Sequence, residues 1–439
     1  MKSIVTLTAS WFVAAAAFTA RADSIAIKAG RVIPVVGDEL KNATIVIENG
    51  MIKAIGQDVA VPLDAILIDA GDKVVFPGLV EAQTQGGLDQ PNETGVSVTP
   101  FVNVYDALDP LSFYLEDVPR EGITTMLVIA GNNCIIGGMG RVIKPSGALN
   151  VEDLTVDPMG GLKLATSPRM GANRMTHMAD MRKAFLELDR AIEDLAEKKY
   201  ADKKKEESGK DEVHYDPTAA RKEGRALIGD ADIDERFRNL YALTQGKVPA
   251  YIYCGEPQDV LPAIQLARER GFLARTTFVL GTSCWKAKDE LKEAGRPVIL
   301  SPELIHREID PVTLEEKETF VPGVFAKENI PFAFQRTNEV DMARSHLWYQ
   351  AALAVRQGMD RSLALKAITL TPAQIIGQGE RLGSLEPGKV GNLVILTGDP
   401  LSATTWVDQV VLEGKVIYER AKDKRLKKLT DPTRAKEES

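Results

Sequence analysis

From Val74 onward, short apolar runs alternate with helical patterns, and this alternation most constrains what the chain can fold into. Helical patterns such as residues 260–270 and 346–357 lie between or after the runs. Alternating strands and helices favour a parallel sheet with helical crossovers. Over roughly 300 residues, this rhythm favours an eight-stranded (β/α)8 TIM barrel over an open sheet. The apolar runs are residues 74–80, 123–130, 249–253, 277–280, 297–300 and 331–334.

Both ends of the chain are rich in strands instead. Residues 44–48 and 51–55 flank Asn49-Gly50, a pair that tolerates the positive φ angles of a tight hairpin turn. Residues 392–396 and 409–418 form further apolar strand patterns near the other end. Because strands bracket the predicted barrel, we expect the two ends to pair into one small β domain.

This reading predicts an α/β protein with five kinds of segment. The charged insertion within the barrel and the charged tail lie outside the expected core. The predicted segments are a signal peptide (1–22), the N-terminal part of a small β-sandwich (23–73), the barrel (74–380) with a charged insertion at about 197–235, the C-terminal part of the sandwich (381–420) and a charged disordered tail (421–439).

The first residues are typical of an export signal. Lys2 precedes a mostly apolar stretch, and Ala20-Arg21-Ala22 is a small-x-small cleavage site. Cleavage after Ala22 would remove Lys2 and Arg21 and change the formal net charge from −8 to −10. We therefore expect a periplasmic or secreted protein without membrane attachment, an uncleaved anchor being the alternative. Such an acidic protein is a poor candidate for nucleic-acid binding.

Three cysteines allow at most one internal disulfide, so the hydrophobic core must hold the fold. Cys134, Cys254 and Cys284 each follow a predicted strand, which could direct them to one end of a barrel. There they could bind a soft metal or form one disulfide. The alternative is that all three are small, buried apolar residues.

Several phrases resemble the amidohydrolase superfamily and its imidazolonepropionase-like branch. Residues 45–56 resemble the family's I-x-x-G-x-I-x-A-I-G hairpin, and residues 75–85 resemble its first barrel strand, which ends in P-G-L-I-D-x-H-x-H. Residues 367–373 resemble A-x-T-x-N-P-A, and residues 382–394 resemble G-S-L-x-P-G-K-x-A-D-L-V. The resemblance implies a distorted (β/α)8 barrel with a β-sandwich built from both termini.

The resemblance also implies hydrolysis of carbon–nitrogen bonds with one or two divalent metals. In the family, the metal ligands are two histidines after strand 1, one after strand 5, one after strand 6 and an aspartate after strand 8. The metal lowers the pKa of a bound water to about 7. At the five matching positions this chain carries Gln83, Gln85, Tyr253, Leu280 and Thr337.

These replacements remove the usual donors, since a glutamine carbonyl binds zinc weakly and leucine has no lone pair. We therefore expect neither a metal, another cofactor nor a conventional catalytic residue. The remaining pocket candidates are Arg336, His306 and the three cysteines, whereas His177 and His214 are expected at the surface and His346 in a structural role. Lys163 is compared with the carboxylated lysine that binuclear members carry on strand 4, but the sequence does not place this strand.

Two functions follow from the resemblance. The first is a non-catalytic barrel that binds a small-molecule ligand or acts as a partner subunit. It would be a homo-oligomer or a hetero-oligomer with an active homologue. The alternative is an active hydrolase that acts on non-peptide, cyclic amide bonds through a rebuilt site.

Overall fold

The computed structural model describes residues 24–93, 95–209, 212–336 and 346–430. The predicted signal peptide, Thr337 and the last nine residues lie outside these ranges. Within them, no helix combines the length and the apolar composition that a membrane crossing needs.

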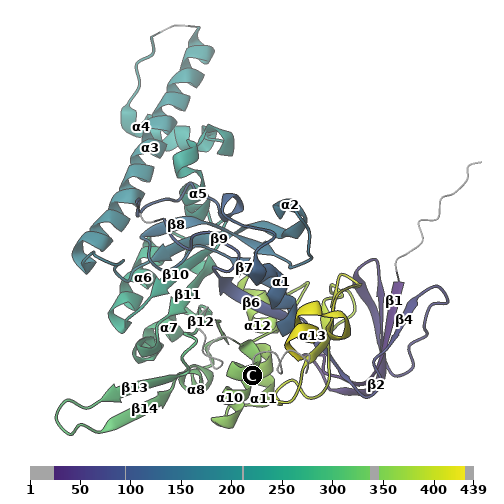
Figure 1. Ribbon diagram of the computed structural model, residues 1–439. Coiled ribbons are helices and arrows are strands. Elements are labelled where there is room, and N and C mark those ends of the chain that lie inside the picture. The colour runs from purple at the N-terminus through teal and green to yellow at the C-terminus, as the bar shows by residue number, and fades with distance from the viewer. Residues whose placement is uncertain (1–23, 94, 210–211, 337–345, 431–439) are drawn as a thin grey trace, which may run out of the picture.

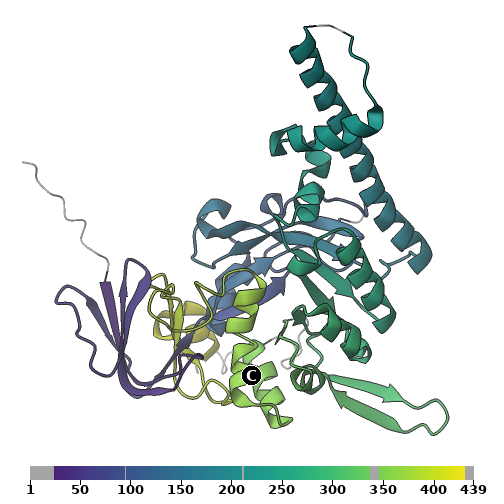
Figure 2. The same cartoon turned by 180° about the vertical axis from the view of Figure 1, so that it is seen from behind.

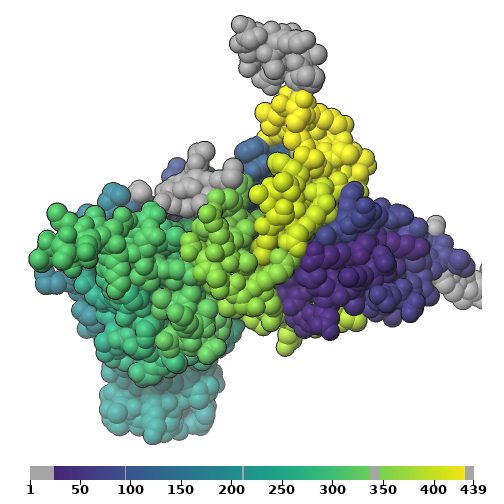
Figure 3. All heavy atoms as spheres, turned by 90° about the horizontal axis from the view of Figure 1, so that it is seen from below, coloured from purple at the N-terminus to yellow at the C-terminus, as the bar shows by residue number. Residues whose placement is uncertain are grey.

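One eight-stranded sheet joins the two ends of the chain, which lie side by side in Figures 1 and 3. β16 pairs antiparallel with β5, with Val394 opposite Phe76. A sandwich needs a second sheet facing the first, and the described residues form a single sheet here, so the predicted sandwich is not confirmed. The strand order is β18 (Lys415–Glu419), β17 (Val407–Leu412), β16 (Leu393–Leu396), β5 (Val74–Pro77), β1 (Ser24–Val32), β2 (Leu40–Glu48) and β3 (Met51–Gly56), with β4 (Ile66–Asp69) paired to β1.

The hairpin predicted at Asn49-Gly50 is present between β2 and β3. Asn49 has a φ of 51° and Gly50 a φ of 78°, as a two-residue turn of this type requires.

A second eight-stranded sheet carries the strands predicted from the apolar runs. Six strands come from those runs, whereas β8 and β9 form a long antiparallel pair that the sequence analysis missed. The order is β15 (Phe332–Ala333), β12 (Val298–Ile299), β11 (Thr276–Leu280), β10 (Ala250–Cys254), β9 (Thr155–Ala165), β8 (Ile136–Ile143), β7 (Ile123–Val128) and β6 (Leu79–Thr84).

The second sheet is not a closed ring of paired strands among the described residues. Its two end strands, β15 and β6, are instead bridged by the backbone of residues 367 and 368. Phe334 N–H donates to the Ala367 carbonyl at 3.1 Å, and Val80 N–H donates to the Ile368 carbonyl at 3.1 Å. The fold is therefore mixed α/β, with a curved sheet whose gap is spanned by one stretch of backbone.

Alternate residues of this sheet face two different cores, as the period of a strand requires. Ile252 and Phe278 belong to the larger hydrophobic cluster, together with residues of the surrounding helices. Tyr251 and Val279, their neighbours in sequence, belong to a smaller cluster with residues of β6, β7 and β12.

The helices that follow the strands cover one side of the sheet (Figures 1 and 2). The longest, α3, forms a projecting helical pair with α4, and Arg221 of α4 contacts Glu193 and Glu197 of α3. The predicted charged insertion at about 197–235 falls on this projection. The α-helices are α1 (Phe113–Asp117), α2 (Val151–Leu154), α3 (Arg174–Ser208), α4 (Pro217–Gly224), α5 (Glu235–Thr244), α6 (Pro257–Glu269), α7 (Lys288–Ala294), α8 (Val321–Lys327), α10 (Leu347–Arg356), α11 (Arg361–Lys366), α12 (Leu370–Ile375) and α13 (Lys424–Thr430).

Two smaller features depart from the sequence analysis. A two-stranded hairpin, β13 (Ile305–Ile309) and β14 (Glu316–Phe320), projects after β12. Residues 421–430, which the sequence analysis placed in a disordered tail, belong to the short helix η7 (Arg420–Lys422) and to α13. Asp423 caps this last helix, since its Oδ1 accepts from Arg425 N–H at 2.9 Å and from Leu426 N–H at 3.2 Å.

Candidate functional site

A cavity of about 490 Å³ lies at the carboxyl ends of β6, β10, β11, β12 and β15. In α/β barrels this end of the strands carries the functional site. Three of the replaced ligand positions and one pocket candidate line this cavity: Gln85, Tyr253, Leu280 and Arg336. Thr84, Asn132 and Ser301 complete a mostly polar wall.

Gln83, the residue before Thr84, does not line this cavity and pairs with Lys163 of β9. Lys163 Nζ donates a hydrogen bond to Gln83 Oε1 at 3.1 Å, and the two residues are 0 % and 1 % exposed. Gln83 Nε2 is also buried and finds no partner among the described residues. Burial lowers the pKa of Lys163 from 10.5 to about 8, because an ammonium loses its hydration there.

Glu81, two residues before Gln83, turns to a different set of partners. Tyr114 O–H donates to Glu81 Oε2 at 2.8 Å, and Arg336 Nη1 lies 3.9 Å from the same oxygen. The ladder between β6 and β7 is irregular between Glu81 and Thr84, and such bulges redirect side chains. Burial raises the pKa of Glu81 from 4.5 to about 7, although Arg336 and Tyr114 oppose this shift.

Thr84 links this buried carboxyl group to the cavity. Its Oγ1 lies 2.7 Å from Tyr114 Oη and accepts a hydrogen bond from Gly86 N–H at 3.1 Å. Either hydroxyl of the Thr84–Tyr114 pair can be the donor. A Cβ atom on Gly86 would lie 2.2 Å from the Tyr114 ring, so the glycine makes room for this tyrosine.

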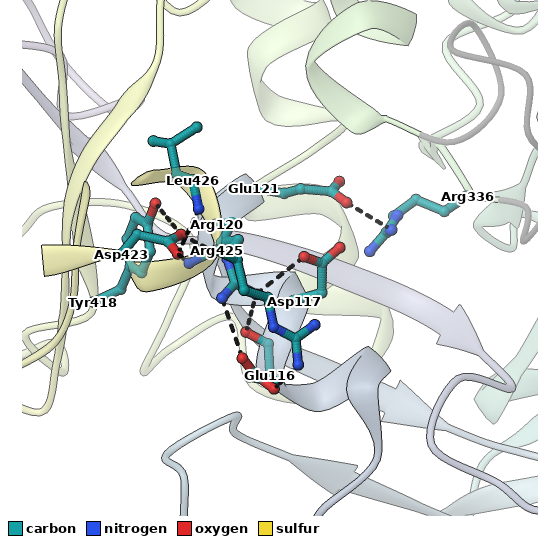
Figure 4. Close-up of polar contacts among 9 residues, drawn as sticks. All are labelled: Glu116, Asp117, Arg120, Glu121, Arg336, Tyr418, Asp423, Arg425 and Leu426. Atoms are coloured by element: carbon teal, nitrogen blue, oxygen red, sulfur yellow. Dashed lines mark hydrogen bonds and ion pairs between the residues drawn. The ribbon is translucent and has the colours of Figure 1, made fainter. Parts of the chain in front are cut away.

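Glu121, at the end of the short helix η2 (Val118–Glu121), fixes Arg336 from the other side (Figure 4). Arg336 Nη2 donates to Glu121 Oε1 at 2.9 Å, and His346 Nδ1 lies 3.0 Å from Glu121 Oε2. This contact raises the pKa of His346. The preceding residue, Arg120, holds Asp423 at 2.8 Å, so η2 contacts both the site and the C-terminal helix.

The described residues that line the cavity include no His, Cys, Asp or Glu. A hydrolytic zinc site needs about three nitrogen, oxygen or sulfur ligands from the protein. No group of three His, Cys, Asp or Glu residues within the described ranges is arranged to hold an ion. Gln83 Oε1, a possible oxygen donor, already accepts from the cationic Lys163.

None of the three cysteines lines this cavity. All three carry free thiols and are buried. Cys134 lines a separate cavity of about 370 Å³, whereas the Cys284 thiol donates to the Cys254 carbonyl at 3.1 Å. Burial raises the pKa of Cys134 to about 11 and of Cys254 to about 12, so these thiols stay protonated.

None of the described histidines is among the residues that line the cavity. His306 is in β13, where its Nδ1 lies 3.2 Å from Thr282 Oγ1. The expectation that His177 is a surface residue is wrong, since it is 0 % exposed. Its Nδ1 accepts from Arg169 N–H at 3.2 Å, so Nε2 carries the proton and donates to the Ala165 carbonyl at 2.7 Å.

The sequence analysis did not single out Glu81 and could not place Lys163. One signal for Glu81 was available, because it stands at the aspartate position of the family's D-x-H-x-H phrase. A charged residue inside an apolar strand pattern was the signal for Lys163. Glu256 and Asp259, two carboxylates that follow β10, form the cap of α6, with Glu256 N–H donating to Asp259 Oδ2 at 3.0 Å.

Comparison with known proteins adds three findings. The sequence model described as "Amidohydrolase family" matches residues 334–418. The chain is 22% identical over 412 residues to amidohydrolase tasK of Hapsidospora irregularis, a match that covers 85% of this chain. The chain spans only 40% of the length of that relative.

The third finding is structural. An amidohydrolase from Thermotoga maritima superposes with a TM-score of 0.71 and 26% sequence identity, over 90% of this chain and 100% of that one. Matches in sequence and in structure therefore agree with the phrases quoted above. The chain belongs to the amidohydrolase superfamily.

Proposed function

We propose that this protein is a non-catalytic amidohydrolase barrel that binds a small molecule in the cavity at its strand ends. The observation that carries the proposal is the hydrogen bond between Lys163 and Gln83. Gln83 stands at the position of the first histidine ligand, and the Lys163 ammonium group that is hydrogen-bonded to it supplies a positive charge there. A divalent cation beside it would be repelled at short range.

The cavity supports the binding role. Its volume of about 490 Å³ lies in the range of small-molecule sites, and its wall offers several hydrogen-bonding groups. The replacement of the metal ligands, including Thr337 outside the described residues, is part of this proposal. So is membership of the imidazolonepropionase-like branch.

The second candidate function is an active hydrolase of cyclic amides with a rebuilt site. The observation in its favour is Glu81, whose pKa of about 7 suits general acid–base catalysis near neutral pH. Glu81 connects to the cavity through Tyr114 and Thr84. In this candidate, Glu81 would exchange a proton with a water held near Thr84.

One experiment separates the two candidates. Thermal-shift screening of small molecules on the wild type is paired with a hydrolysis assay on cyclic amides. Ser301→Phe fills the cavity, whereas the exposed Ser402→Phe serves as its control. We expect ligands that stabilise the wild type and the control but not Ser301→Phe, and no turnover. Turnover that is lost in Glu81→Gln and in Ser301→Phe would establish the hydrolase instead.

Export and assembly are further parts of the proposal. We place the protein in the periplasm or outside the cell, because the first 22 residues are typical of a cleaved signal. An intact mass equal to that of a chain beginning at Asp23 would support this. We also propose that it assembles with itself or with an active homologue, which sedimentation with and without that homologue tests.

A further inference from the structure

We propose that the ligand of the cavity is a small molecule with a single carboxylate group, which pairs with the Lys163 ammonium and accepts from the Gln83 amide. The inference rests on the binding function proposed above and specifies the chemistry of its ligand.

Lys163 carries a positive charge that no carboxylate of the described residues balances. Lys163 is fully buried and has three N–H donors, and its hydrogen bond within the described structure goes to the neutral Gln83. No carboxylate of the described residues forms an ion pair with it. The ionisable groups that act on its charge are the thiols of Cys134 and Cys254, whose raised pKa values keep them neutral. A buried ammonium without an anion is costly, so an anionic ligand would gain from meeting it.

The hydrogen-bond donors of Lys163 and Gln83 indicate which ligand atoms can bind them. Because Lys163 donates to Gln83 Oε1, the Nε2 group of Gln83 presents two donors, and it finds no acceptor among the described residues. Lys163 therefore offers only donors to a ligand, and Gln83 offers two donors beside the second lone pair of its Oε1. An ionised carboxylate has only acceptors, whereas a primary amide brings donors of its own.

The charges of Arg336 and Lys163 indicate how many negative charges the ligand carries. Arg336, the other cation at the cavity, contacts Glu121 at 2.9 Å and Glu81 at 3.9 Å. Its charge is therefore balanced within the protein, and Lys163 supplies one unbalanced positive charge. This favours a monocarboxylate over a phosphate or a dicarboxylate.

Tyr253 lies next to both the cavity and the ammonium group. It lines the cavity, and the centre of its ring lies 6.0 Å from Lys163 Nζ. In the proposed complex, a rotation of Tyr253 admits the carboxylate to Lys163. Side-chain rotations at binding sites are common while the backbone stays in place.

The test is calorimetric titration with matched acids and amides: propionate and propionamide, benzoate and benzamide, indole-3-acetate and its amide. The proteins are the wild type, Lys163→Met, which keeps the length of the side chain but not its charge, and Lys247→Met. Lys247 forms an exposed ion pair with Asp230, so its loss controls for the change of net charge. We expect at least one acid to bind the wild type and Lys247→Met tenfold or more tightly than its amide. Lys163→Met should show no such preference.

Equal affinity for acid and amide in the wild type, or a preference that survives in Lys163→Met, would overturn the inference. So would the absence of binding by every acid. If neutral molecules then still stabilise the wild type but not Ser301→Phe, the binding function stands and only the ligand class is wrong. Thermal unfolding of each variant shows whether it is folded, and we expect Lys163→Met to be at least as stable as the wild type.

Discussion

Lys163 and Gln83 are 80 positions apart in the sequence, yet their side chains meet at 3.1 Å in the interior of the protein. The contact joins β9 to the end of β6, and both groups are almost fully buried. The resemblance to amidohydrolases implies a metal ligand at position 83, and here the contact brings a fixed cation from the protein itself. Its consequences for stability, charge and metal binding are measurable.

Lys163→Met should stabilise the folded protein at neutral pH. The pKa of Lys163 falls from 10.5 to about 8 on folding, so the unfolded chain binds more protons between these values and the wild type gains stability as pH rises through them. We expect the variant to exceed the wild type by up to roughly 3 kcal/mol at pH 7. Urea unfolding at pH 7, 8, 9 and 10 measures this difference. A difference that does not shrink with pH would contradict the burial of the charged amine.

Glu81→Gln should show the opposite dependence on pH. The pKa of Glu81 rises from 4.5 to about 7 on folding, so the folded protein holds its proton more tightly and loses stability as pH rises from 4.5 through 7. Glutamine keeps an acceptor for Tyr114 but does not titrate. We expect the variant to equal the wild type near pH 4.5 and to be more stable at pH 8, by roughly 1 to 3 kcal/mol. The same difference in stability between variant and wild type at pH 4.5 and at pH 8 would show that Glu81 does not change its protonation.

Glu121→Gln should lower the pKa of His346. The hydrogen bond and the charge of Glu121 raise that pKa, while partial burial opposes the rise. The variant keeps the shape of the side chain but loses its charge. An NMR titration can follow His346, because the chain has four histidines and burial lowers the pKa of His177. Asp117→Asn is the control, because it removes a charge that has a smaller effect on the pKa of His346. An unchanged His346 titration in Glu121→Gln would exclude the contact.

Asp423→Ala should release the C-terminal helix. Burial alone would raise the pKa of Asp423, but hydrogen bonds from Arg120 and from the backbone of α13 lower it to about 2. Its stabilising contribution is therefore present above pH 3.8 and is lost as pH falls through about 2. We expect a loss of roughly 1 to 3 kcal/mol and faster tryptic cleavage after Lys422 and Lys424. Asp408→Asn, which breaks a more exposed pair with Lys73, should leave that cleavage unchanged.

Local signals explain what the sequence could predict. The Asn49-Gly50 hairpin depends on two neighbouring residues, and the ends of β10 and β11 follow from short apolar runs. Those strand ends bring Tyr253 and Leu280 to the cavity with Gln85 and Arg336. No long-range information was needed for this grouping once a barrel was expected.

Long-range and irregular features were not predictable. β8 contains Gly137-Gly138-Met139-Gly140, which lacks the branched and aromatic residues of a typical strand. Without β8 and β9 the position of Lys163 could not be found. The contact between Arg336 and Glu121 spans 215 positions, and nothing in either neighbourhood indicates the other.

Metal content tests the central claim most directly. The mature protein is purified without chelator or affinity tag, incubated with zinc or manganese, desalted and analysed by plasma mass spectrometry beside Lys163→Met. We expect less than about 0.1 divalent ion per chain in the wild type, because a fixed ammonium stands beside the first ligand position. Near-stoichiometric metal in the wild type would contradict the account and would show that the site is a metal centre.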